Sequence, residues 1–248
     1  FEGTGNNKGV EFYNPTSDYI DLTDYTLVRY ANGSSAPTDQ TQLVGVLEPY
    51  STWVLVNGQT EDVDLGGGNI SPACDSTLQE LADQLDNPYP APTFFNGDDA
   101  LVLTKNGEII DVFGKVGEDP GNAWTDDPSA GYSDYNGGNW ISANHTLRRK
   151  YLIGSGVTEN PIEFNAILEW DTLPVNTWEG IGYHECFCYQ NEEEEEEDGC
   201  CCCPFPVPYL QRPRLLWAGV RGEGCCSARG IARAETHSTT PRRSPRHE

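Results

Sequence analysis

Lysine and arginine are scarce in this sequence of 248 residues. They number 15 against 39 aspartates and glutamates, which gives a formal net charge of −24 at pH 7. Residues 1–189 hold 29 acidic and 7 basic residues, a charge of −22, whereas residues 190–248 hold 10 and 8, a charge of −2. Nucleic acids and anionic membranes are bound by clustered basic side chains. The charge therefore argues against duplex nucleic acid or membrane as a direct partner, and it suits solubility in a salty or Ca²⁺-containing external medium.

Long apolar runs and catalytic motifs are missing too. No stretch of 18 or more apolar residues occurs, so the sequence predicts no membrane span. It has no G-x-S-x-G, no P-loop and no G-x-G-x-x-G after a strand. Of the four histidines, His237 and His247 lie in the C-terminal tail, and His184 is expected to bond to backbone near the domain end. A metal-dependent nuclease or phosphatase needs histidine and carboxylates around its metal, so we predict that the chain is not an enzyme.

Cysteine is almost confined to the C-terminal quarter. Of nine cysteines, only Cys74 precedes residue 186, and an odd number leaves at least one thiol unpaired in a monomer. In an external protein Cys74 could bridge Cys186 or Cys188; the alternative is a free, partly buried thiol. Cys200-x-x-Cys203 matches half of a zinc site, but no second pair with suitable spacing follows it.

The sequence predicts a β-hairpin over residues 100–114. Two β-rich runs, Ala100–Lys105 and Glu108–Gly114, are separated by Asn106-Gly107, the dipeptide that favours a two-residue type I′ turn. Such a turn pairs residues at a fixed offset, and side chains alternate between the faces. We therefore expect three facing pairs on one side, each worth roughly 0.2–1 kcal/mol: Lys105–Glu108, Leu103–Ile110 and Leu101–Val112.

Many short strands separated by turn residues surround this hairpin and indicate an all-β sandwich. The expected strands are 10–14, 20–22, 26–30, 42–47, 53–56, 140–141, 146–149, 164–170 and 177–181, with 42–47 and 53–56 joined as a hairpin. Both faces of 53–56 are apolar, which is typical of a central, covered strand. One helix is expected over about 75–85, since Asp75 or Ser76 can cap it and Leu78, Leu81 and Leu85 follow at helical spacing.

Four stretches together resemble the lamin tail domain family, in its secreted bacterial or other extracellular form. They read GTGNNKGVEFYNPTSDYIDLTDYTLVRYANG (3–33), FFNGDDALVLTKNGEIIDVFGKVGEDPGNAW (94–124), NHTLRRK (144–150) and WDTLPVNTWEGIGYH (170–184). The resemblance covers about residues 1–184. It implies an immunoglobulin-like β-sandwich used as a binding or accessory module, and it carries no agreed catalytic residues. Members usually have a few further residues of strand before the position of Phe1, so we expect the first strand to be truncated.

Residues 190–248 form a separate, low-complexity tail after the domain of residues 1–189. Six consecutive glutamates, a run of four cysteines and alternating prolines show neither a two-residue nor a 3.6-residue period, which predicts disorder. The abrupt change in composition is also compatible with a frame slip or a misread intron, and both readings stay open.

Acidic loops make Ca²⁺ the ion to expect, with Asp98, Asp99 and Asp119 as candidate ligands. Hard oxygen ligands on loops suit this ion, but the D-x-D-x-D-G spacing is absent, so the alternative is a set of solvated turn carboxylates. No other cofactor is expected.

Aromatic residues in the loop 118–139 and just after it offer a second candidate site. Trp124, Tyr132, Tyr135 and Trp140 could stack against a sugar; the alternative is that they hold the loop on the sandwich. The basic cluster Arg148–Lys150 is expected to neutralise nearby carboxylates.

The function predicted is a non-catalytic extracellular interaction module that presents loops to a protein or glycan partner. The alternative is an accessory domain of a secreted metal-dependent nuclease or phosphatase. An external location follows from the family resemblance, with weaker support from the N-glycosylation sequons at Asn32 and Asn144.

Overall fold

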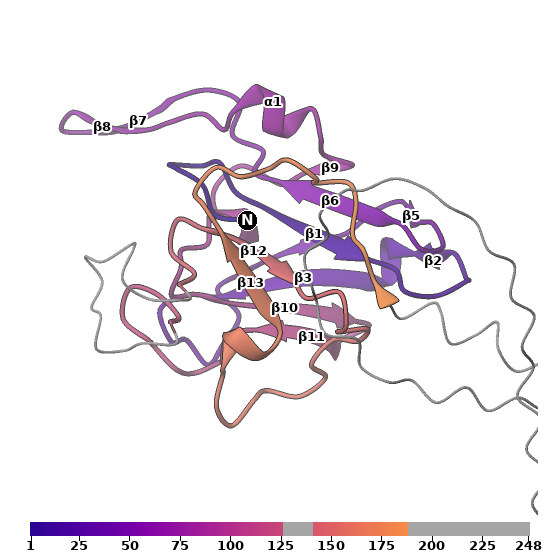
Figure 1. Ribbon diagram of the computed structural model, residues 1–248. Helices are drawn as coiled ribbons and strands as arrows, with labels where there is room; N and C mark the ends of the chain where they lie inside the picture. The colour runs from indigo at the N-terminus through magenta and orange to yellow at the C-terminus, as the bar shows by residue number, and fades with distance from the viewer. Residues whose placement is uncertain (126–140, 188–248) are drawn as a thin grey trace, which may run out of the picture. The chain divides into compact units, whose positions relative to one another are not determined.

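The computed structural model of the chain describes residues 1–125 and 141–187. Its regular elements are nearly all short strands (Figure 1). In chain order they are β1 (Gly9–Tyr13), β2 (Ile20–Asp21), η1 (Leu22–Asp24), β3 (Tyr25–Tyr30), β4 (Asp39–Gln42), β5 (Val46–Leu47), β6 (Thr52–Val56), β7 (Val63–Gly66), β8 (Asn69–Ser71), α1 (Ser76–Gln79), β9 (Gln84–Leu85), η2 (Pro92–Phe94), β10 (Ala100–Lys105), β11 (Glu108–Phe113), β12 (Thr146–Arg149), η3 (Ala166–Leu168) and β13 (Trp170–Leu173).

Two sheets face one another and form the expected immunoglobulin-like β-sandwich. One sheet has the order β1-β6-β9 and the other the order β11-β10-β3-β4. Their neighbours are antiparallel except for β6 and β9, which are parallel. The space between them is filled by a cluster of buried apolar side chains, with Leu27 from β3 and Trp53 and Leu55 from β6 among them. The prediction of an all-β sandwich is confirmed.

Strand β6 is buried on both faces, as its sequence predicts. Trp53 and Leu55 point between the sheets, and Val54 and Val56 point to the outer face, where Leu78 of α1 packs on them. None of the four β6 side chains is more than 5 % exposed. The outer face of the other sheet is covered as well, because Val116 and Val157 pack over Val28, Val102 and Val112.

The predicted hairpin is present, but its register shifts after the two residue pairs nearest the turn. Asn106 and Gly107 have φ of 50° and 89°, as a type I′ turn requires, and Lys105 pairs with Glu108. A β-bulge then shifts the register, so that Leu103 faces Asp111 and Val102 faces Val112. The expected pairs Leu103–Ile110 and Leu101–Val112 are therefore wrong. A bulge re-aims the side chains that follow it; here Val112 joins the outer cluster, and Asp111 is hydrogen-bonded to Arg149.

The expected helix over 75–85 is a single turn. Asp75 caps it by accepting a hydrogen bond from the Thr77 N–H at 2.8 Å, but α1 ends at Gln79. The backbone then follows β6 instead, because Asp83 N–H donates to the Val54 carbonyl and Asp86 N–H to the Val56 carbonyl. Sheet pairing thus outcompetes helix propensity in this segment, and Leu81 and Leu85 are left exposed.

Other expected strands pair differently or do not form. Segments 42–47 and 53–56 are no hairpin, since β4 pairs with β3, β5 with β2 and β6 with β1. Within 164–170 the chain forms η3, followed by β13 from Trp170, and 177–181 forms no strand.

The β12–β13 ribbon lies in front of the two sheets in Figure 1. An aromatic cluster joins it to β11: Phe113 makes edge contacts with Phe164 and Trp170, at centroid distances of 5.2 and 5.5 Å. Trp124 adds an edge contact to Phe164 at 5.3 Å. Aromatic pairs with this geometry contribute beyond their buried area, so these rings fix the ribbon to the end of β11.

Cys74 is a free thiol, and burial raises its pKa to about 11. The alternative of a bridge from Cys74 to Cys186 or Cys188 is therefore not realised, although Cys186 is disulfide-bonded.

The chain divides into two compact units, residues 1–198 and residues 199–248. The tail predicted for 190–248 lies outside the described residues. Within the described residues, no helix is long and apolar enough to cross a membrane.

Replacement of Leu55 by alanine is expected to destabilise the domain by about 2–5 kcal/mol, because it removes a fully buried side chain between the sheets and leaves a cavity. Leu65→Ala is the matched control, since Leu65 is 69 % exposed, and it should change stability by less than about 0.5 kcal/mol. Chemical denaturation of both variants measures the difference. Equal losses would contradict the assignment of Leu55 to the core.

Candidate functional site

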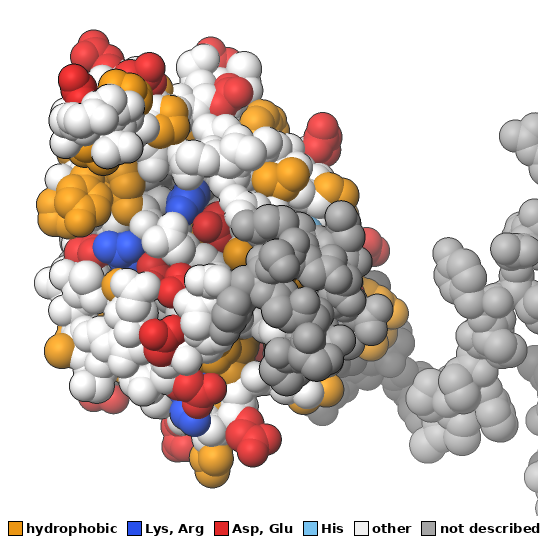
Figure 2. Space-filling view, turned by 90° about the vertical axis from the view of Figure 1, so that its left-hand side faces the viewer, with side chains coloured by type: hydrophobic (Ala, Val, Ile, Leu, Met, Phe, Trp, Pro, Cys, Tyr) orange, Lys and Arg blue, Asp and Glu red, His pale blue; other side chains and the backbone are white. Residues whose placement is uncertain are grey.

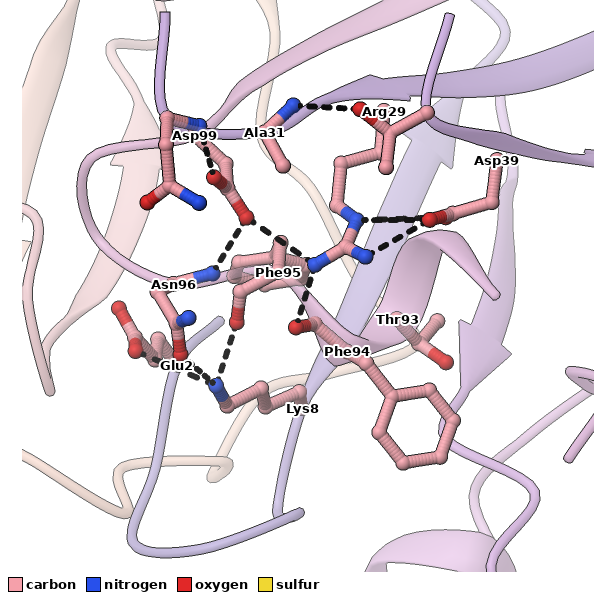
Figure 3. Close-up of polar contacts among 12 residues, drawn as sticks. Glu2, Lys8, Arg29, Ala31, Asp39, Thr93, Phe94, Phe95, Asn96 and Asp99 are labelled. Carbon is pink, nitrogen blue, oxygen red and sulfur yellow. Dashed lines mark hydrogen bonds and ion pairs between the residues drawn. The ribbon is translucent and has the colours of Figure 1, made fainter. Parts of the chain in front are cut away.

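The predicted acidic site begins in the loop after η2, and Figure 3 shows that this loop is a structural junction. Asp99 is 2 % exposed, and both of its carboxylate oxygens are occupied. One accepts hydrogen bonds from Arg29 Nη1 at 3.2 Å and the Asn96 N–H at 2.9 Å. The other accepts from the Asn32 N–H at 2.9 Å. Asp99 therefore links β3 and the loop that follows β3 to its own turn.

Arg29 and Lys8 hold this loop from the two sheets. Arg29, on β3, pairs with Asp39 at 2.7 Å and with Asp99, and donates to the Phe94 carbonyl at 2.8 Å. Burial alone would lower the Arg29 pKa, but hydrogen bonds and charge from Asp39 and Asp99 outweigh it and raise the pKa. Lys8, beside β1, donates to the Phe95 carbonyl and to Asn96 Oδ1.

The Lys8 ammonium also needs a counter-charge, and Glu2 supplies it at 3.4 Å. Both residues are buried. Burial raises the pKa of the Glu2 carboxyl, and the Lys8 charge acts against that rise. Buried charges persist only when they are paired and hydrogen-bonded, so the loop 94–99 receives one compensated cation from each sheet.

The three candidate Ca²⁺ ligands are thus not equivalent. The Asp99 carboxylate already accepts a hydrogen bond from Arg29. Asp119 is exposed and accepts a hydrogen bond from the Gly121 N–H. Burial, followed by the charges of Asp99 and Asp119, raises the pKa of the Asp98 carboxyl. No group of three or more His, Cys, Asp or Glu side chains is placed to hold a metal ion within residues 1–125 and 141–187.

Of the four residues of the predicted aromatic platform, only Trp124 lies in the described part of the chain. Trp124 is 4 % exposed, packs in the aromatic cluster beside β12–β13, and donates its indole N–H to the Asp99 carbonyl at 3.1 Å. A stacking platform needs a free ring face, which a buried ring lacks. Tyr132, Tyr135 and Trp140 lie outside the described residues.

The basic cluster splits across the β12 strand. Arg149 stacks on Trp170 and pairs with Asp111 and with Glu169, the latter at 3.1 Å. This is the neutralising role expected from the sequence. Arg148 donates to the Glu179 carbonyl at 3.0 Å and has no ion pair with a carboxylate among the described residues.

Exposed aliphatic side chains lie on a hairpin that sequence reasoning did not identify. Strands β7 and β8, with the intervening Gly66–Gly68 turn, form what we call the β7–β8 arm, which extends away from the sandwich in Figure 1. Leu65 is 69 % exposed and Ile70 is 54 % exposed. At the base of the arm, Ser71 accepts a hydrogen bond from Asn6 Nδ2 at 2.9 Å.

Charge on the arm and around it is acidic. Glu61, Asp62 and Asp64 precede or lie on β7, and no Lys or Arg occurs between Val63 and Ser71. The coloured part of the face in Figure 2 shows the same imbalance, because acidic side chains are spread over it and Lys and Arg appear in few places. The arm therefore offers aliphatic contacts inside an acidic field.

Some of these features had a signal in the sequence. Three consecutive glycines between two short aliphatic segments indicate a tight hairpin, and their φ values of 86°, 65° and 85° show why glycine is needed. The burial of Lys8 and Arg29 had no such signal, since Arg29 and Asp99 are 70 residues apart in the chain.

Two packed, mainly antiparallel sheets with a buried interface define the domain as an immunoglobulin-like β-sandwich. The family model described as Lamin Tail Domain matches residues 1–117, and this part of the chain belongs to that family. The match confirms the resemblance over β1 to β11 and does not extend over the remainder of the predicted range to 184. The family is one of non-enzymatic, immunoglobulin-like domains. No curated protein and no solved structure matched the chain.

Replacing Arg29 by methionine is expected to destabilise the domain by about 3–5 kcal/mol, because Asp39 and Asp99 would be left as uncompensated buried carboxylates. Lys115→Met is the matched control. It breaks the more exposed Lys115–Glu118 pair and should cost less than about 1 kcal/mol. Urea denaturation compares the two; a loss for Arg29→Met as small as that of the control would show that the cluster is not structural.

Calcium binding by the acidic loop stays a prediction. A ligand that binds only the folded state raises its melting temperature, so millimolar Ca²⁺ should raise it relative to chelator, and Asp119→Asn should remove the increase. The substitution keeps the size of the side chain and deletes an exposed charge, so folding is unaffected. A melting curve that is identical in Ca²⁺ and in chelator would contradict the prediction.

Proposed function

We propose that the chain acts as a non-catalytic, extracellular interaction module whose contact surface is centred on the β7–β8 arm. The observation that carries this proposal is the exposure of aliphatic side chains on a hairpin that extends from the sandwich. An isolated two-stranded hairpin is marginally stable in water. A partner that covers Leu65 and Ile70 would therefore stabilise the arm as well as gain apolar contact.

The chemistry of the arm favours a basic protein partner. Three acidic residues, Glu61, Asp62 and Asp64, are close to the aliphatic residues in the sequence, with no Lys or Arg between them. Complementary charge speeds association and excludes like-charged partners. A second copy of this domain, with −22 over residues 1–189, is disfavoured by the same rule.

A glycan partner has less support from the described residues. Sugars are bound by exposed aromatic faces, and Trp124 is buried. An accessory role beside a nuclease or phosphatase is compatible with the same arm, because the arm could contact a catalytic domain. In that case too, the chain itself would contribute binding and no catalysis.

Substitution of Leu65 and Ile70 by serine together should weaken capture of the partner at least about tenfold, since buried aliphatic anchors carry much of the energy of an interface. The partner is captured from the external medium of the source organism with the full chain, and its affinity is then measured at low and high salt. Affinity should fall as salt rises.

The matched control replaces Leu152 and Ile162 by serine. These two side chains are also exposed, at 64 % and 89 %, but they belong to the segment between β12 and η3 and not to the arm. Both double variants should melt like the unmodified chain. Equal capture by both variants, or capture of nothing by the unmodified chain, would contradict the proposed function.

A further inference from the structure

A cavity of about 390 Å³ lies along β1, between the two sheets and the β12–β13 ribbon. We call it the inter-sheet cavity. Its volume falls in the range of roughly 300–1,000 Å³ that is usual for small-molecule sites. Apolar side chains from both sheets line most of it: Val10, Phe12, Leu27, Leu43, Leu101 and Leu103.

Several inward-facing side chains are not fully covered. Val10 and Phe12 on β1 and Leu101 and Leu103 on β10 pack against the buried cluster between the sheets, yet each is only half-buried. Leu27 and Leu55 in the same cluster are at most 2 % exposed. Interiors are normally close-packed, so an opening on the β1–β10 side of the sandwich leaves apolar surface that a ligand could cover.

One polar end of the cavity is formed by Glu11, Arg148 and His184, and the cavity lining also includes Glu2, Asp99, Asp111 and Arg149. Arg148 packs against Gly180 and donates to the Glu179 carbonyl, while its neighbour Arg149 has two carboxylate partners. Burial lowers the pKa of His184, and the charges of Arg148 and Arg149 lower it further. The Glu185 carboxylate acts in the opposite direction on His184.

Glu11 is committed to the protein. Its carboxylate accepts a hydrogen bond from the Gly182 N–H at 2.5 Å, and burial raises its pKa, with the Arg148 charge acting against that rise. Of the charged groups at this end, the Arg148 guanidinium is thus the one that lacks a carboxylate partner among the described residues.

We propose that the inter-sheet cavity binds an elongated apolar molecule that ends in a carboxylate, with its apolar body between β1 and β10 and its carboxylate on Arg148. Apolar contact would supply most of the binding, and the guanidinium would fix the orientation through two parallel N–H···O bonds. This site is separate from the β7–β8 arm and does not depend on the proposed function.

Calorimetric titration of the full chain with dodecanoic acid, dodecanol and dodecylamine tests the proposal, because the three probes share one apolar body. One molecule per chain should bind, and the acid should bind at least about tenfold more tightly than the alcohol. Arg148→Gln should reduce the affinity for the acid to that for the alcohol and leave the alcohol unaffected. Lys115→Gln, a basic residue outside the cavity, should change neither.

A second variant, Leu103→Trp, fills the apolar part and should abolish binding of all three probes, with Leu65→Trp on the arm as its control. If Leu103→Trp does not fold, Arg148→Gln decides alone, since Arg148 is not part of the core. Several outcomes would overturn the proposal: no binding, binding of many molecules per chain, tightest binding of the amine, or an acid preference that survives Arg148→Gln.

Discussion

The two cations that hold the loop 94–99 are the constraint on which the arrangement of the sandwich depends. Lys8 reaches the loop from the β1 sheet and Arg29 from the β3 sheet, and both donate to main-chain carbonyls as well as to side chains. Asp99 then carries the connection onward, because its carbonyl accepts the Trp124 indole N–H. The two sheets, the loop and the aromatic cluster are thus joined by a few buried polar contacts. Removing one partner of such a contact would leave a buried polar group unsatisfied and would destabilise the fold.

This constraint also decides where binding can occur. In the loop, Asp99 is used for structure, and the aromatic ring of Trp124 is used for packing. The surfaces that we propose for binding lie elsewhere, on the β7–β8 arm and around the open side of the sandwich near β12. A lamin tail domain of this form would then combine a rigid core with contact features that the core does not need.

The sequence predicts what local chemistry determines. The type I′ turn at Asn106-Gly107, the two-sided burial of β6 and the Asp75 cap all follow from neighbouring residues. The bulge after Leu103 and the early end of α1 do not, because each depends on pairing with another part of the chain. The candidate Ca²⁺ residue Asp99 illustrates the same limit: the partner that gives it a structural role is Arg29, on a distant strand.

Amide hydrogen exchange tests the central claim most directly, namely that the loop 94–99 is as firmly held as the sheets it joins. The Asn32 and Asn96 amides, which donate to Asp99, should exchange as slowly as amides of β6, because they open only when the domain unfolds. Amides of the β7–β8 arm should exchange quickly. Fast exchange at Asn32 and Asn96 in a chain whose β6 amides remain protected would contradict the claim.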